Sequence, residues 1–374
     1  MNRTRGQGLP RVEAVSVRNF RCLRDVQIKG LMPVTAFLGA NGSGKSTLLD
    51  VFAFLAECFR DGLRMAWERR GRFKEMRTWG AQGPIVIEIK YRERPESPGI
   101  IYHLAVDENE NGPFVAEEWI RWRRWLRSNP FRMLDGKNGM VRITLGEMPD
   151  EHDPTAEMML GTTDVPAVAI LGQMNGYPRI SALRRYIAAW RFAGEAVYRS
   201  GPAPVRQQLL DGIRLLQNEQ PERLREIFKV LEERIPGATG LLTVAPDPAA
   251  WLLSRTDLSQ GTLSLLAHLI GLADMAQPAL AGMDLPETGI HPRLQPGLAG
   301  DFRTLSAQTQ CLISTHSPFL ANGLTPEEVW AFNRNKEGHT IVRKTIDLPG
   351  VRDFMSQGAM LGYLWTEGYF EAQE

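Results

Sequence analysis

Hydrophobic and polar residues alternate near the start of the chain, and this pattern predicts short strands. Val15 and Val17 alternate with polar residues, and the same alternation returns at 26–28. Apart from Thr35, the run 34–38 is apolar, which is typical of a strand that is buried on both faces. Apolar residues then recur at helical spacing over 48–55. We therefore expect a buried strand that leads directly into a helix.

The rest of the chain divides in the same way. Four more stretches have strand composition: 85–91, 100–106, 119–126 and 141–145. Residues 146–165 are acidic and rich in turn formers, so a surface loop is expected there. Three stretches have helical spacing: 180–192, 204–217 and 221–235. Strand character resumes at 240–244, an amphipathic helix begins near 260, and strands are expected at 279–284 and 310–316.

These elements predict an α/β fold with a mixed sheet, an antiparallel β lobe and a helical insert. The lobe is built from residues 11–30 and 84–146. We expect three segments along the chain: an amino-terminal part of the core domain (1–165), the helical insert (166–240) and a carboxyl-terminal part of the core domain (241–374). No heptad run long enough for a coiled-coil arm occurs in the insert.

The amino-acid composition is that of an ordinary globular protein. The chain has 374 residues, of which 43% are hydrophobic and 23% charged, as in ordinary globular proteins. The net charge of +1 favours neither binding nor exclusion of nucleic acid. The three cysteines are scattered in apolar contexts and indicate buried thiols in a reducing compartment. We find no signal peptide and no membrane-spanning run, so a cytoplasmic location is expected.

The segment between the buried strand and the first helix has the pattern of a phosphate-binding loop. It reads Gly39, Ala40, Asn41, Gly42, Ser43, Gly44, Lys45, Ser46, Thr47. This is a complete G-x-x-x-x-G-K-[ST] motif, called Walker A. Its glycines let backbone N–H groups surround phosphate oxygens at the positive end of a helix. Lys45 can reach the β- and γ-phosphates and the Ser46 hydroxyl can hold Mg²⁺, so we expect ATP and Mg²⁺ as ligands.

The second half of the chain carries three further candidate elements in a fixed order. Ser259 and Gly261 begin the helix near 260, and such a helix start is an anion site as well as an ordinary N-cap. Asp284 ends a weakly apolar strand, and His316 follows the next strand. The order is Walker A, signature loop, Walker B carboxylate and His loop.

That order, together with four sequence stretches, resembles the RecF/SMC/OLD branch of ABC-type ATPases. The stretches are VRNFRCLRDVQI before Walker A, PETGIHP after Asp284, ISTHSPFL around His316 and LGYLWTEGYF near the end. The resemblance covers most of the chain outside the helical insert. Transporter nucleotide domains are the less favoured alternative, because they lack the Asn-Phe-Arg opening and the PETGIHP run. The fold class implied is a P-loop ABC-type ATPase head.

The resemblance also implies roles for individual residues. Arg21 is expected near the bound phosphates, the alternative being a solvated arginine at a strand end. Gln82 is a candidate contact for Mg²⁺ and the attacking water. Asp284 would hold Mg²⁺, and His316 would bond the γ-phosphate and the water. Ser259 and Gly261 would cap the γ-phosphate held by a second chain, which implies a head-to-tail homodimer around two ATP molecules.

One position departs from the family pattern. Relatives place a carboxylate directly after the Mg²⁺ ligand, where it acts as the general base, and this chain has Leu285. Three interpretations stay open. Glu287 or Gln82 orients the water instead; the protein hydrolyses ATP slowly and acts as an ATP-locked sensor or scaffold; or Leu285 is a substitution made to trap ATP.

The function expected is ATP-driven closure of a dimer that signals to DNA or to a partner effector, in genome maintenance or anti-phage defence. OLD-like proteins often carry a TOPRIM nuclease, for which this sequence leaves too few residues, so a nuclease would be a separate partner. The stretch Trp119–Arg127 mixes tryptophans with arginines. Such a strand can stack bases and neutralise phosphates, or its long cationic stems can cover its own aromatic surface. We favour the covering role.

Overall fold

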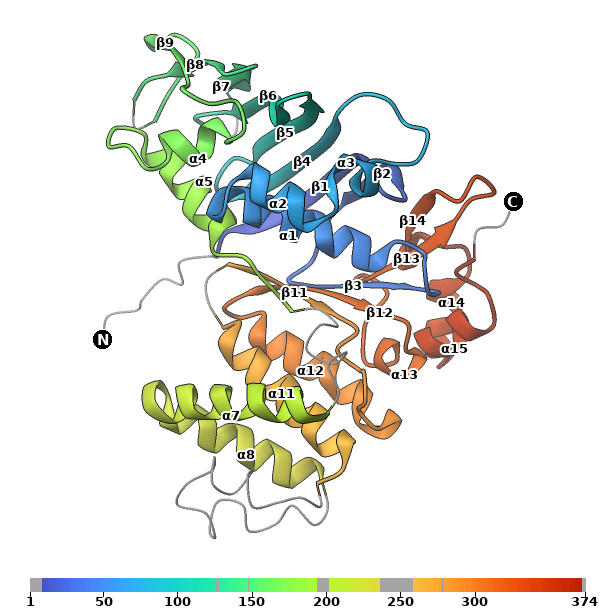
Figure 1. Ribbon diagram of the computed structural model, residues 1–374. Coiled ribbons are helices and arrows are strands. Elements are labelled where there is room, and N and C mark those ends of the chain that lie inside the picture. The colour runs from blue at the N-terminus through green and yellow to red at the C-terminus, as the bar shows by residue number, and fades with distance from the viewer. Residues whose placement is uncertain are drawn as a thin grey trace.

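The computed structural model describes residues 9–125, 128–146, 148–193, 202–235, 258–276 and 279–371, and two sheets organise them (Figure 1). The eight-stranded sheet is antiparallel, in the order β2-β1-β4-β5-β6-β7-β8-β9. Its strands are β1 (Arg11–Phe20), β2 (Leu23–Lys29), β4 (Ile85–Arg92), β5 (Ile100–Asn109), β6 (Gly112–Trp122), β7 (Phe131–Lys137), β8 (Met140–Thr144) and β9 (Thr155–Met159).

The six-stranded sheet has the order β10-β11-β12-β3-β13-β14 and is parallel except for its last strand. Its strands are β3 (Val34–Gly39), β10 (Arg191–Ala193), β11 (Leu280–Asp284), β12 (Gln310–Thr315), β13 (Val329–Arg334) and β14 (Thr340–Lys344). Because β3, β11 and β12 are parallel neighbours, their carboxyl ends meet at one edge. That edge carries the Walker A loop, Asp284 and His316.

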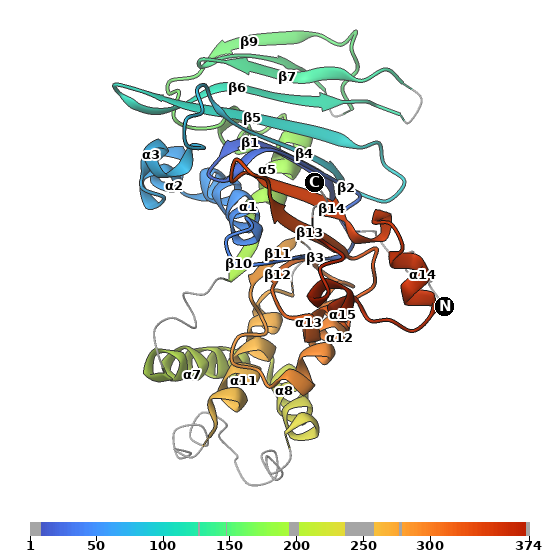
Figure 2. The ribbon, with the colours of Figure 1, turned by 90° about the vertical axis from the view of Figure 1, so that its right-hand side faces the viewer.

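Helices fill the space between the sheets and cover the outer face of the six-stranded sheet. They are α1 (Lys45–Arg60), α2 (Leu63–Arg69), α3 (Arg72–Met76), α4 (Ala167–Leu171), α5 (Pro178–Ala188), α7 (Pro202–Glu219), α8 (Pro221–Arg234), α11 (Gln260–Asp274), α12 (Gln295–Leu305), α13 (Pro318–Ala321), α14 (Val351–Ser356) and α15 (Leu361–Thr366). Figure 2 shows the layers: the eight-stranded sheet, then α1, then the six-stranded sheet, with α7, α8 and α11 at the far end.

Two hydrophobic clusters hold these layers together. One joins α1, α4 and α5 to the eight-stranded sheet, and the other joins α7, α8, α11 and α12 to the six-stranded sheet. Strand β3 contributes to both, because Phe37 belongs to the first cluster while Ala36 and Leu38 belong to the second. This explains why apolar residues occur on both faces of β3. The helices of segment 166–240 are divided between the two clusters.

The α/β fold with an antiparallel sheet is confirmed, and three local expectations need correction. The strand expected at 119–126 is β6, which ends at Trp122, and β7 was not expected. The segment 146–165 is not entirely loop, since β9 pairs with β8. The helix expected at 180–192 ends at Ala188. The strand expected at 240–244 lies outside the described residues.

Strands β7 and β9 are hard to predict because the contrast between their two faces is weak. Every second residue of β9 is exposed, and an ion pair between Arg142 of β8 and Glu157 of β9 lies across the two strands at 2.6 Å. Strand β10 is only three residues long and packs Phe192 into the space left by Gly282, which has no side chain. Of the residues described, no helix is long and apolar enough to cross a membrane.

Candidate functional site at the carboxyl edge of the six-stranded sheet

The Walker A loop joins β3 to α1 and takes a backbone shape that requires glycine. Gly42 and Gly44 have φ angles of 77° and 105°, in the left-handed region that other residues rarely adopt. Two side chains from the neighbouring hairpin bind carbonyl oxygens of the loop: Arg334 Nε donates to Gly42 O (2.6 Å) and Thr340 Oγ1 to Ser43 O (2.8 Å). The loop is therefore held in place by β13 and β14 as well as by its own glycines.

Lys45 is the first residue of α1 and its side chain is buried, with the residue only 4% exposed. Its Nζ donates to Ala40 O at 2.8 Å across the loop. Burial lowers the pKa of Lys45, and the negative charges of Asp284 and Glu287 act against that shift. A buried ammonium with one carbonyl partner retains two donors, which suits a polyphosphate.

Asp284 at the end of β11 lies beside Ser46 at the start of α1. The Ser46 hydroxyl donates to Asp284 Oδ1 at 2.8 Å, and the Ser314 hydroxyl of β12 donates to the same oxygen. Nowhere in the described part of the chain do three or more His, Cys, Asp or Glu side chains form a metal cluster. One carboxylate and one hydroxyl nevertheless fit Mg²⁺, which commonly takes few protein ligands beside phosphate and water.

Glu287 lies in the turn after β11 and is 5% exposed. Its Oε1 accepts from Thr315 Oγ1 (2.7 Å) and from the backbone N–H of His316 (3.2 Å). Its Oε2 is buried and has no hydrogen-bond partner among the described residues. Burial raises the pKa of Glu287, and the two hydrogen bonds oppose this effect. The two hydrogen bonds thus fix the orientation of the carboxyl group, and its Oε2 stays available to accept a hydrogen bond.

Leu285, which follows Asp284, has a backbone conformation unusual for its residue type. Its φ angle is 51°, and its N–H donates to Ser314 O at 3.1 Å. A left-handed leucine costs about 1–2 kcal/mol, so the surrounding turn enforces this shape. The turn is closed by the Thr288 hydroxyl, which donates to Leu285 O at 2.8 Å. The side chain is half-buried and has no group that could take a proton.

The signature loop lies next to this turn in the same chain. Ser259 caps α11, and its Oγ accepts from Thr262 N at 3.2 Å. Gly261 approaches Gly289 so closely that an added Cβ would lie 3.4 Å from the Gly289 carbonyl oxygen. Ser259 is exposed, and no hydrogen bond joins it to the Walker A loop among the described residues. His316 is also exposed, at the end of β12.

Family models match two parts of the chain. Residues 11–121 match the model described as "AAA ATPase domain", and residues 171–322 match "AAA domain, putative AbiEii toxin, Type IV TA system". The DNA replication and repair protein RecF of Heliobacterium modesticaldum is 35% identical over 86 residues, 21% of this chain. The match spans only 23% of that relative's length.

One solved structure has a similar fold. The crystal structure of the SmcHead bound to the C-winged helix domain of ScpA has a TM-score of 0.52 and 13% identity, covering 89% of this chain and 97% of that one. Together these similarities support the resemblance to the RecF/SMC/OLD-like ABC-type ATPases.

Arg21 and Gln82 are the two other residues expected at the site, and neither forms a hydrogen bond to Asp284 or Glu287 among the described residues. Arg21 has a φ of 46° and pairs with Asp50 of α1 at 2.9 Å, and Asp50 also pairs with Arg70 at 2.8 Å. Gln82 is exposed, and only its carbonyl is engaged, by Asn19 Nδ2 at 3.4 Å. Across the described ranges, no hydrogen bond joins the Gln82 side chain to Ser46 or Asp284.

Sequence reasoning missed the residues that orient the side chains of this site. Ser314 and Thr315 hold Asp284 and Glu287 from β12, and both hydroxyl residues are fully buried. A signal was present, because two adjacent hydroxyl residues end an otherwise apolar strand. Arg334 and Thr340 support the Walker A loop from about 300 residues away in sequence, and no local pattern identifies them.

Proposed function

We propose that this protein binds ATP and Mg²⁺ at the carboxyl edge of the six-stranded sheet and uses the nucleotide to close a head-to-tail homodimer. The observation that carries the proposal is the convergence of Lys45, Ser46, Asp284 and Glu287 at that edge. Lys45 would hold the β- and γ-phosphates, while Ser46 and Asp284 would hold the metal. Exposed His316 would contact the terminal phosphate.

We further propose that Glu287 orients the attacking water. Its buried Oε2 lacks a partner within the described residues, and Thr315 and the His316 N–H fix the other oxygen. A carboxylate in this state can accept a proton without first breaking a hydrogen bond. Its raised pKa also makes it a stronger base than an exposed glutamate. Gln82 would reach the site only after a movement of its exposed loop.

A second candidate is a slow or non-hydrolysing sensor that stays locked by ATP. Leu285 favours it, because the position next to the metal carboxylate cannot act as a base. In that case the ATP-bound dimer itself would be the signal. The two candidates share the nucleotide site and the dimer, and they differ only in how long the closed state lasts.

The homodimer proposal rests on Ser259 and Gly261. They begin α11 on an exposed surface, where helix N–H groups and the helix dipole favour an anion. Within one chain this surface has no hydrogen bond to the Walker A loop among the described residues, so a phosphate bound by a second chain is the anion proposed. The closed dimer would act on a separate effector, in genome maintenance or anti-phage defence in the cytoplasm. The SMC head solved with ScpA supports a protein as partner.

Replacement of Ser259 by arginine tests the dimer. The new side chain would fill the space proposed for the partner's γ-phosphate, so ATP should still bind while the ATP-dependent dimer falls at least about tenfold. Light scattering after size exclusion, with and without ATP and Mg²⁺, measures the dimer. Ser356→Arg, at an exposed serine at the end of α14, is the matched control. Equal dimer formation by wild type and Ser259→Arg would refute the head-to-tail model.

A further inference from the structure

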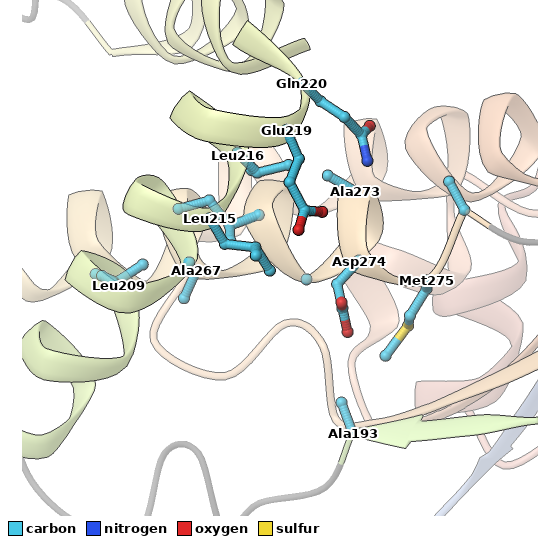
Figure 3. Close-up of a pocket in the computed structure, with 14 residues that line it drawn as sticks. Ala193, Leu209, Leu215, Leu216, Glu219, Gln220, Ala267, Ala273, Asp274 and Met275 are labelled. Atoms are coloured by element: carbon cyan, nitrogen blue, oxygen red, sulfur yellow. The ribbon is translucent and has the colours of Figure 1, made fainter. Parts of the chain in front are cut away.

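A cavity of about 410 Å³ lies between α7 and α11, close to the end of β10 (Figure 3). It is far along α11 from the signature loop, because Ala267 to Asp274 of that helix line it. Its size is that of a site for one or two side chains or a small ligand. No part of the nucleotide site described above contributes to it.

The walls of the cavity are mostly apolar, and α7 and α11 approach each other closely there. Gly212 of α7 faces Ile270 of α11, and an added Cβ would lie 2.8 Å from Ile270 Cγ2. This contact brings the two helices together at the cavity. Leu215 lines the same space and is 49% exposed, so the cavity presents apolar surface to the solvent.

Two carboxylates border the cavity from the ends of two helices. Glu219 is the last residue of α7 and Asp274 is the last residue of α11, and neither helix has a basic residue in its final turn. Figure 3 shows both side chains at the border of the cavity. No ion pair joins either carboxylate to a cation of the described residues. Acidic residues at helix C-termini are electrostatically unfavourable, so a cation bound there would be stabilised.

We propose that this cavity, the α7–α11 pocket, is a docking site for a partner protein that presents an apolar side chain next to a lysine or arginine. The apolar side chain would enter between Leu215 and Ile270, and the cation would lie at Glu219 and Asp274. The inference rests on the proposed function in one respect, since the docked protein is the effector on which the dimer acts.

The position of the pocket links docking to the nucleotide state. One rigid helix, α11, carries the pocket at its carboxyl end and Ser259 and Gly261 at its start. A helix of this length spans roughly 22 Å at 1.5 Å per residue. A shift of α11 on dimer closure therefore moves both ends together. By linkage, ATP and the docked segment change each other's affinity by the same factor.

A phage-displayed library of random twelve-residue peptides, panned on the full-length protein, tests the proposal. We expect enrichment of sequences that combine an apolar residue with a neighbouring arginine or lysine. A selected peptide is then titrated by fluorescence anisotropy against the variants. The double variant Glu219→Gln, Asp274→Asn should weaken affinity about tenfold and reduce its salt dependence. Glu226→Gln, an exposed acid on α8, should have no effect.

Filling the pocket gives an independent test. An added Cβ at Gly271 meets only Met283 Cε, at 3.8 Å, so Gly271→Leu should fold and place its side chain in the cavity. This variant should lose peptide binding. A library without enrichment, or peptides that bind Gly271→Leu or the double variant as they bind wild type, would overturn the proposal. Lys45→Ala should still bind the peptide in the absence of nucleotide. Peptide binding therefore tests the docking site separately from the proposed ATP site.

Discussion

Two regions of the molecule have sequences that indicate phosphate binding. They are the carboxyl edge of the six-stranded sheet and the strand β6 of the eight-stranded sheet. Each carries cations beside residues that could contact a nucleotide. At the sheet edge, Lys45 is buried with one carbonyl partner, and Glu287 has one oxygen without a partner among the described residues. These groups have hydrogen-bonding capacity that the chain itself does not use.

On β6 the same kinds of side chain are already occupied by one another. The rings of Trp119 and His103 stack with centroids 4.5 Å apart, and the guanidinium groups of Arg121 and Arg132 lie 5.2 and 5.0 Å from the Trp119 ring. Trp122 is capped by Arg179 at 4.9 Å, and its Nε1 donates to Pro149 O at 2.9 Å. Unused hydrogen-bonding capacity, and not residue type, therefore separates the two regions.

Lys45→Ala would have the largest effect and tests the first half of the comparison. It removes the only buried ammonium beside Asp284 and Glu287 in the described structure, so ATP affinity should fall about a hundredfold or more. Isothermal calorimetry with ATP and Mg²⁺ measures the loss. Lys74→Ala, on an exposed face of α3, serves as the control. Unchanged affinity in Lys45→Ala would mean that the loop is not the nucleotide site.

The variants Glu287→Gln and Leu285→Glu test whether Glu287 is the general base for ATP hydrolysis. If Glu287 is the base, Glu287→Gln should lower kcat by a factor of roughly 10²–10⁴ while the Kd for ATP changes little. Leu285→Glu should then have a small effect. In the opposite case the wild type hydrolyses ATP slowly and Leu285→Glu raises kcat strongly. That result would identify the ATP-locked sensor. Single-turnover hydrolysis and ATP titration of each variant distinguish the two.

The sequence could predict the nucleotide loop because its chemistry is local. Glycines at fixed spacing, a strand before them and a helix after them determine the loop, and the structure places the loop as expected. The order of Asp284 and His316 at strand ends was also readable, since parallel strands end at one edge. The support from Arg334 and Thr340 depends on the pairing of β13 with β3, which no local pattern encodes.

The eight-stranded sheet was harder to predict because its later strands have two nearly equivalent faces. Strand β7 alternates weakly, and β9 exposes every second residue while none of the others is fully buried. Their register is set by neighbouring strands and by pairs such as Arg142 with Glu157. Gln82 shows a different limit, since its exposed side chain has no hydrogen bond to Ser46 or Asp284 within the described residues and its role stays a prediction.

The smallest effect is expected on β6, where the comparison predicts a structural role. Arg121 and Arg132 cover Trp119, so replacing both with alanine should lower the free energy of unfolding by about 0.5–1 kcal/mol for each. Urea denaturation measures this loss, with Arg142→Ala of β8 as a control whose partner is an exposed carboxylate. Any affinity for duplex DNA in the presence of ATP should change less than about twofold, because the covered aromatic faces cannot stack bases. A tenfold loss of DNA binding with a shallower salt dependence would instead make β6 a nucleic-acid contact and remove the contrast with the sheet edge.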